Sequence, residues 1–390
     1  MGIIMKRKIT DSIVYVGADD LTIDLFESQY QVPNGISYNS YIILDDKITI
    51  MDTIDKRCTE EWLTNIEETL GNQEPSDLVV SHMEPDHAAN IKTLSEKYPT
   101  MQVVGNAKTF DMINAFFDID LTERMVTVKE GDILSLGSHT LQFYMAPMVH
   151  WPEVMVTYEV SEKVLFSADG FGKFGALSVE EPWAEEAKRY YYNIVGKYGV
   201  QVQMLLKKAA GLDISRICPL HGPVLTENLG YYIDKYNTWS SYIPEDQGVL
   251  IAYASIYGNT AAAAEKMAEI IRAQGVRNVL VRDLAREDMA QVVSDAFTYD
   301  KLIVASPTYD GGVFPCVDTF LRKLQMKNYQ KRKVGFMENG SWAPMAAKKM
   351  REAMEGLKEV TICEQVVSIK SAMKAANIDE MKKLTEELCI

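Results

Sequence analysis

The chain has 390 residues, 47% of them hydrophobic and 24% charged, a composition typical of a soluble globular protein with two or three domains. Its formal net charge of −15 argues against nucleic acid and anionic membrane surfaces as partners, because both would repel it. No apolar run approaches the ~18 residues of a membrane span, and none follows the basic N-terminus, so we expect no membrane segment and no secretory signal. The 5 cysteines lie far apart without a CxxC pair, which excludes a CxxC zinc site or a rubredoxin-type site in this chain and predicts a reducing, cytoplasmic location.

The first part of the chain shows short β-like runs at irregular spacing. We predict strands at residues 37–44, 47–51, 78–81, 102–104, 140–146, 155–160 and 163–167, with a further strand-like run at 214–218. Helical patterns interrupt them at residues 58–70 and 185–210.

After about residue 245, strands and helices alternate regularly. The expected strands are 249–254, 278–281, 302–305, 334–337 and 360–367, and the expected helices are 260–273, 317–324 and 344–357. Such alternation predicts a parallel sheet covered by helices on both faces. A polar stretch at residues 242–248, with Pro244 and Gly248, is typical of a linker. We therefore predict two α/β domains, at residues 1–247 and 248–390.

Metal-binding side chains gather after predicted strands of the first domain. Four follow the strand at 78–81 within a few residues, and three more each follow a strand of their own; the set is His82, Glu84, Asp86, His87, His150, Asp169 and His221. Any one of these histidines alone is explained as a hydrogen-bonded residue, and His139 has only that explanation. Because strand ends on one sheet edge converge, we expect the whole set to surround a pair of metal ions.

The motif of His82, Glu84, Asp86 and His87 resembles the signature of the metallo-β-lactamase superfamily, whose fold is an αββα sandwich with a two-metal site. Hydrolytic members usually have His at the second position, and Glu84 makes this chain resemble the flavodiiron proteins instead. An acidic, oxygen-rich ligand set also suits iron better than zinc. By this resemblance His82, Glu84 and His150 hold one iron, Asp86, His87 and His221 hold the other, and Asp169 bridges them.

Polar loops follow three strands of the second domain, where open α/β sheets bind ligands. The first loop leads directly into a helix, and the N-terminus of a helix favours binding of a phosphate. This loop contains no Lys, which excludes a P-loop NTPase. The candidate residues are Ser255, Ile256, Tyr257, Gly258, Asn259 and Thr260 in the first loop, Ser306, Pro307, Thr308, Tyr309, Asp310, Gly311 and Gly312 in the second, and Asn339, Gly340, Ser341 and Trp342 in the third.

This half resembles flavodoxin, a doubly wound parallel sheet that binds FMN. The first loop matches the FMN phosphate loop, although Tyr257 stands where many flavodoxins carry Thr or Ser. The other two loops match segments that flank the isoalloxazine ring, on which Tyr309 and Trp342 are candidates to stack. A β-lactamase-like domain followed directly by a flavodoxin domain resembles the flavodiiron proteins over essentially the whole chain.

The resemblance implies an oxidoreductase that passes electrons from FMN to two non-haem irons, which reduce O2 to water, NO to N2O, or both, as in anaerobes. No separate side-chain nucleophile is needed. The implied partners are an external donor, either rubredoxin or a reduced deazaflavin, and a second copy in a head-to-tail homodimer or a dimer of dimers. The alternatives are a two-metal zinc hydrolase with a fused flavodoxin domain, and an electron carrier that keeps the ligands without catalysis.

Overall fold

The structure, a computed structural model, describes residues 7–389, so most of the N-terminal segment in which we expect no secretory signal lies outside the described residues. The chain forms two compact units. One holds the described residues up to Tyr191 together with Val200–Asn237, and the other holds Tyr192–Gly199 together with the described residues from Thr238 onwards. None of the helices between residues 7 and 389 has the length and hydropathy to cross a bilayer.

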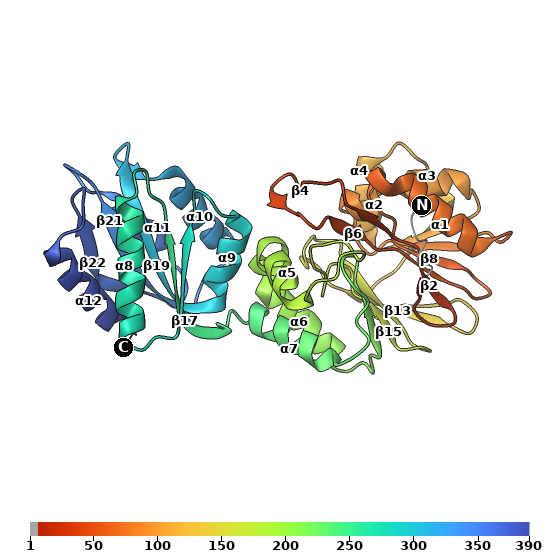
Figure 1. The fold of residues 1–390 in the computed structure, drawn as a ribbon. Helices are drawn as coiled ribbons and strands as arrows, with labels where there is room; N and C mark the ends of the chain where they lie inside the picture. Colours follow the sequence, from red (N-terminus) through yellow and green to blue (C-terminus); the bar gives the residue numbers. More distant parts are fainter. Residues whose placement is uncertain (1–6, 390) are drawn as a thin grey trace. The chain divides into compact units, whose positions relative to one another are not determined.

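The first unit contains two sheets that pack face to face (Figure 1). The larger sheet has the strand order β1 (Arg7–Lys8), β2 (Ile13–Tyr15), β7 (Tyr41–Ile43), β8 (Thr49–Met51), β9 (Asp77–Val79), β10 (Gln102–Gly105) and β11 (Met125–Thr127). The smaller sheet has the order β12 (Ile133–Ser135), β13 (Thr140–Met145), β14 (Met155–Glu159), β15 (Val164–Phe166) and β16 (Arg216–Cys218). Two hairpin-like pairs lie apart from these sheets: β3 (Ala18–Asp20) with β6 (Ile36–Tyr38), and β4 (Leu25–Phe26) with β5 (Tyr30–Gln31).

Apolar residues of both sheets form one buried core, in which Ile43 and Val79 of the larger sheet join Phe143 and Phe166 of the smaller. The helices of this unit are α1 (Thr59–Leu70), α2 (Pro85–Ala88), α3 (Ile91–Lys97), α4 (Ala107–Phe116), α5 (Trp183–Tyr190), α6 (Gly199–Ala209) and most of α7 (Leu229–Ser240). The predicted αββα sandwich is confirmed.

The second unit is a parallel sheet with the strand order β18 (Asn278–Asp283), β17 (Asp246–Tyr253), β19 (Tyr299–Tyr309), β21 (Arg332–Asn339) and β22 (Val360–Ile369). The short β20 (Gly312–Val313) pairs with β19. Numbered within this unit the order is 2-1-3-4-5, that of a flavodoxin-like doubly wound sheet. Its helices are α8 (Asn259–Ala273), α9 (Met289–Thr298), α10 (Pro315–Met326), α11 (Ala346–Met354) and α12 (Ala375–Cys389), of which α8 and α12 share one core with the sheet. The predicted fold class of this half is confirmed.

The strand predicted at residues 37–44 is wrong as a single element, because Asn39 and Ser40 separate β6 from β7. The buried Asn39 side chain donates hydrogen bonds to the carbonyl oxygens of Pro219 and Gly222, both at 2.8 Å. The interruption therefore fastens the turn that carries His221.

The helix predicted at residues 185–210 is also wrong as a single element. A π-helical turn at Tyr191–Val195 and a 3-10 turn at Gly196–Tyr198 separate α5 from α6. The interrupted segment Tyr192–Gly199 belongs to the second unit, where the Tyr192 ring stacks on Phe297 at 4.3 Å. Tyr242, placed in the linker by its sequence context, is likewise buried in the second unit. The boundary at residue 247 between the metal-binding domain and the flavodoxin-like domain stays a prediction.

Candidate metal centre and flavin site

The seven candidate metal-binding side chains lie where strands of the first unit end. His82 and Glu84 lie in the loop between β9 and α2, and Asp86 and His87 lie on α2. The other three follow the ends of β13, β15 and β16, and they are His150, Asp169 and His221. They form two groups whose candidate ligand atoms lie within 4.8 Å of one another.

The first group consists of His82, Glu84, His150 and Asp169. The Nε2 atom of His150 lies 3.0 Å from a carboxylate oxygen of Glu84 and 3.0 Å from Oδ2 of Asp169. The Nε2 atom of His82 lies 3.4 Å from the same Glu84 oxygen and 3.5 Å from the same Asp169 oxygen. Two imidazoles and two carboxylates thus point their ligand atoms at one small volume.

The second group consists of Asp86, His87 and His221. Oδ2 of Asp86 lies 3.3 Å from Nε2 of His87 and 3.2 Å from Nε2 of His221. Asp169 links the groups, because its other oxygen, Oδ1, lies 3.3 Å from Nε2 of His87. The two oxygens of this one carboxylate therefore face different groups.

Metal ions fit this arrangement. Both carboxylate oxygens of Asp86 and of Asp169 are buried without a hydrogen-bond partner among the described residues, although buried carboxylates ordinarily have one. Burial opposes ionisation of Asp169, but the neighbouring histidines hold its pKa well below its usual range, so it remains a carboxylate. Buried, ionised and unpartnered oxygens facing imidazole nitrogens are the donors that a divalent or trivalent cation needs.

Two further carboxylates hold the loop that carries His82. Asp52 accepts hydrogen bonds from the backbone N–H groups of Ser81, at 2.6 Å, and His82, at 3.3 Å. Glu153 accepts one from the N–H of Met83 at 2.8 Å, and its Oε1 lies 2.8 Å from Nδ1 of His82. A carboxylate on the far nitrogen of a metal-binding histidine fixes the ring and makes it a stronger ligand. Neither Asp52 nor Glu153 was predicted from the sequence to act at this site.

Replacing Glu153 by glutamine is expected to weaken metal binding by about 10–100-fold, since the amide lacks the charge that supports His82. Competition with a chromophoric chelator measures this affinity. Glu159→Gln is the matched control, because Glu159 is equally buried but accepts its hydrogen bonds from the backbone of Ser161 and Glu162. Equal losses in the two variants would contradict a role for Glu153 at the metal centre.

Metal affinity is expected to rise with pH. Burial raises the pKa of Asp86 to about 7, and Glu84 and Asp169 add to the shift. Burial lowers the pKa of His150, but Asp169 and Glu84 outweigh it and raise that pKa to about 9. Both groups must release a proton to bind a cation, so affinity should rise by about tenfold per pH unit between about pH 7 and pH 9, where His150 alone of the two is protonated, and more steeply below about pH 7. Titrations with Fe²⁺ or Zn²⁺ at several pH values check this, and a flat profile would contradict it.

Other residues around the centre are aromatic. The Phe26 ring, on β4, meets the His221 ring edge-on at 5.4 Å, and the Tyr190 ring lies 5.6 Å from it. Nδ1 of His221 lies 2.7 Å from the carbonyl oxygen of Ser37, which fixes the ring so that Nε2 faces Asp86. His139 lies apart from both groups, hydrogen-bonded to Asp45 and Ser12.

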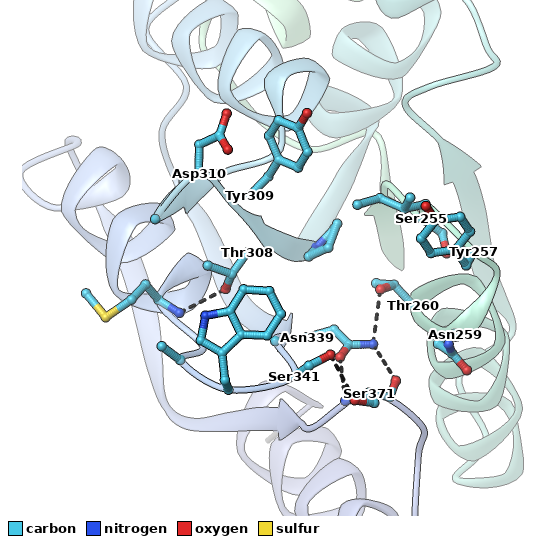
Figure 2. A pocket seen from close by; sticks show the side chains of 17 residues that line it. Ser255, Tyr257, Asn259, Thr260, Thr308, Tyr309, Asp310, Asn339, Ser341 and Ser371 are labelled. Carbon is cyan, nitrogen blue, oxygen red and sulfur yellow. Dashed lines mark hydrogen bonds between the residues drawn. The ribbon is translucent and has the colours of Figure 1, made fainter.

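The second unit has a cavity of about 520 Å³ at the carboxyl ends of its strands (Figure 2). One wall is the loop between β17 and α8, where Gly258 adopts a left-handed conformation (φ +90°) directly before the helix. Its N–H donates to the Ser255 hydroxyl at 3.1 Å. The loop therefore places the free N–H groups of the first turn of α8 at the cavity, as a phosphate site requires.

Most of the predicted flavin residues line this cavity, and three do not. The lining includes Ser255, Ile256, Tyr257, Asn259, Thr260, Pro307, Thr308, Tyr309, Asp310, Gly311, Asn339, Gly340, Ser341 and Trp342, whereas Gly258, Ser306 and Gly312 are absent from it. Ser306 is buried because β19 continues to Tyr309, so the loop predicted to begin at residue 306 begins later. Gly312 lies on β20.

A fourth loop, after β22, also lines the cavity and was not predicted from the sequence. Ser371 lines the cavity, and its N–H donates to the Asn339 side chain at 3.1 Å while its hydroxyl meets that of Ser341 at 2.9 Å. Figure 2 shows Asn339, Ser341 and Ser371 together on one side of the cavity. The rule that ligands bind at strand ends points to this loop as well, because the loop follows the strand predicted at residues 360–367.

Large aromatic side chains are exposed around the cavity. Tyr257 is 92% exposed, Trp342 90% and Tyr309 45%. Tyr309 packs edge-on against Phe314 at 5.4 Å, whereas Trp342 is almost fully open to solvent. Exposed aromatic rings beside a hydroxyl-lined loop and a helix N-terminus fit a ligand with a flat ring system and a phosphate, as FMN has.

Comparisons with known proteins agree with the two sites. Residues 36–222 match the model of the ODP family beta lactamase, and residues 250–373 match a flavodoxin domain. The nitric oxide reductase of Moorella thermoacetica is 29% identical over 97% of this chain and 97% of its own. The rubredoxin-oxygen oxidoreductase of Megalodesulfovibrio gigas is 28% identical over 98% of this chain and 96% of its own. The solved rubredoxin oxygen:oxidoreductase of Desulfovibrio gigas superposes with a TM-score of 0.93 at 27% identity, covering 98% and 97% of the two chains.

Fold and sites together define a metal-binding β-lactamase-like domain joined to an FMN-binding flavodoxin domain. The chain belongs to the flavodiiron proteins. The predicted cofactors, two non-haem irons and FMN, are those of this family and are confirmed at that level.

Proposed function

We propose that this protein is an oxidoreductase in which FMN supplies electrons to a diiron site that reduces O2 to water, NO to N2O, or both. The shared carboxylate carries the proposal: Asp169 faces both groups of ligands, and Glu84 supplies an oxygen where hydrolytic relatives carry His. Relatives named as a nitric oxide reductase and a rubredoxin-oxygen oxidoreductase support the same chemistry. No observation favours the hydrolase or the inert carrier.

We assign the first iron to His82, Glu84 and His150, the second to Asp86, His87 and His221, and the bridge to Asp169, as the spacing of the two groups supports. When bound, the iron pair and FMN supply all the redox chemistry. The protein keeps the ligand atoms away from water, since His82, His87, Asp169 and His221 are all fully buried. It also holds the imidazole rings in orientation through Glu153 and Ser37.

Anaerobic stopped-flow mixing tests the function. Fully reduced protein, shown by analysis to contain two irons and one FMN per chain, is mixed with O2 and in a second run with NO. We expect the flavin to reoxidise with consumption of at least one gas. Two zinc ions per chain after growth with ample iron, or reduced protein that consumes neither gas, would contradict the proposal.

We further propose a reducing, cytoplasmic location and an external donor, either rubredoxin or a reduced deazaflavin. All 5 cysteines are free, as expected in a reducing compartment. One relative is named for rubredoxin. Rates of FMN reduction by each donor under anaerobic conditions decide between them, and no reduction by either would exclude both.

We also propose a head-to-tail homodimer in which the FMN of one chain serves the iron pair of the other. The chain passes between the two units three times, at residues 191–192, 199–200 and 237–238, and these direct connections limit how far the flavin domain can reach within one chain. Two inactive variants test this: His87→Ala with His221→Ala, which removes metal, and Gly258→Val, which removes FMN.

If electrons pass across the dimer interface, subunit exchange should restore about half of the wild-type activity per heterodimer. A two-fold dimer of the two variants retains one place where an intact FMN faces an intact iron pair. Confirmed heterodimers without activity, or a fully active monomer, would show transfer within one chain.

A further inference from the structure

A small cavity lies in the first unit between helix α6 and the five-stranded sheet (Figure 1 shows α6 and α7 beside β15). Its walls include Tyr144, Val156 and Leu165 of the sheet, Val202 of α6 and Tyr236 of α7. Its volume of about 20 Å³ slightly exceeds the roughly 10–15 Å³ that one water-sized occupant needs. It can therefore hold a diatomic molecule and little more.

Most residues of the lining are apolar, and the polar groups of three others, Tyr144, Ser167 and Lys208, are hydrogen-bonded to other residues. The Ser167 hydroxyl donates to the carbonyl oxygen of Gly170 at 2.6 Å, and the Lys208 ammonium donates to that of Met145 at 2.8 Å. A trapped water needs two to four polar partners, and apolar cavities of this kind stay dry and take up apolar gases.

The cavity is lined on one side by residues of α6 and the turn after it, and on the other by residues next to two candidate ligands in the chain. Leu205, Leu206 and Leu212 on one side are half-buried. Val149 and Gly170 on the other side immediately precede and follow the ligands His150 and Asp169 in the chain. Both of these ligands belong to the group that contains Glu84.

We propose that this cavity is a binding site for a small apolar gas, O2 or NO, and a supply route to the metal centre. The inference rests on the proposed function and extends it to the path of the substrate. Both gases dissolve better in hydrocarbon than in water, so an apolar cavity concentrates them beside the ligand loops while excluding ions and most polar solutes.

Noble-gas binding tests the site on the unmodified protein, independently of turnover. Crystals of the holoprotein pressurised with krypton or xenon should show a gas atom between Val202 and Leu165. Gas density only at other positions, or none, would overturn the proposal.

Filling the cavity tests the route. Val202→Phe should slow NO binding to the reduced protein at least about threefold in stopped flow, with iron and FMN content unchanged. Val200→Phe is the matched control, because Val200 lies on the same helix but is 68% exposed, whereas Val202 is 1% exposed. Unchanged NO binding in a fully loaded Val202→Phe variant would overturn the route. Failure of the unmodified protein to consume O2 or NO would instead refute the proposed function. The noble-gas experiment would still test gas binding in the cavity, because it does not depend on turnover.

Discussion

Asp169→Asn should lower iron content or gas reduction by at least about tenfold. Even the loss of a residue that only supports a metal ligand commonly lowers metal affinity or activity by about 10–100-fold. The substitution removes the negative charge whose two oxygens face the two ligand groups. It also turns one acceptor oxygen into an amide that donates hydrogen bonds, and an amide nitrogen of this kind does not coordinate a cation. Iron analysis and anaerobic stopped flow measure both quantities.

Asp45→Asn is the matched control for this variant. The Asp45 carboxylate is also buried in the first unit, but it accepts hydrogen bonds from the backbone and ring of His139, away from both ligand groups. It should keep its iron even if its stability falls, and FMN should remain bound in both variants. Full iron and undiminished gas reduction in Asp169→Asn would show that Asp169 is not a ligand.

Gly258→Val should yield a colourless protein that still contains iron. Gly258 has φ +90°, which a β-branched residue reaches only at a cost of about 1–2 kcal/mol. A Cβ at this position would meet no other atom within 4 Å, so the substitution disturbs the backbone conformation of the loop and not the packing of neighbouring side chains. We expect FMN to bind at least about tenfold more weakly, because the N–H groups lose their orientation towards the phosphate.

Gly275→Val separates this effect from a general loss of stability. Gly275 lies beyond the other end of α8 with φ +92° and equally open surroundings, so valine there carries the same backbone cost. That variant should keep its flavin. Stoichiometric FMN in Gly258→Val would place the phosphate elsewhere, and loss of FMN in both variants would show that only the helix is being destabilised.

The candidate ligands could be predicted because each is a metal-binding residue type directly after a strand, a local pattern that a fold brings together. The supporting carboxylates could not be predicted this way. Glu153 acts on His82 across 71 residues, and Asp52 reaches Ser81 across 29, so their roles exist only in the folded chain. The interruption at Asn39 was hidden for the same reason, since its hydrogen-bond partners lie about 180 residues away.

In the second domain the alternating pattern identified the sheet, but α9 and α12 were missed. Asp288 caps α9 by accepting hydrogen bonds from the N–H groups of Ala290 and Gln291, a local signal that sequence reasoning can use. The end of β19 was placed too early because Pro307 suggests a turn, whereas the structure holds it in the strand, paired in register with Asn339.

The segment Tyr192–Gly199 makes the flavodoxin half a discontinuous domain, completed by residues that precede it by about fifty positions. Asn193 donates to the carbonyl oxygen of Ala290 at 3.0 Å, and Asn328 donates to that of Lys197 at 2.6 Å, beside the Tyr192–Phe297 stack. A fragment cut at residue 247 would leave these groups and the Phe297 ring uncovered. A flavin domain that begins at residue 248 therefore lacks part of its own packing, and a gene fusion that joins or removes this domain at that single junction would separate it from residues that complete its core.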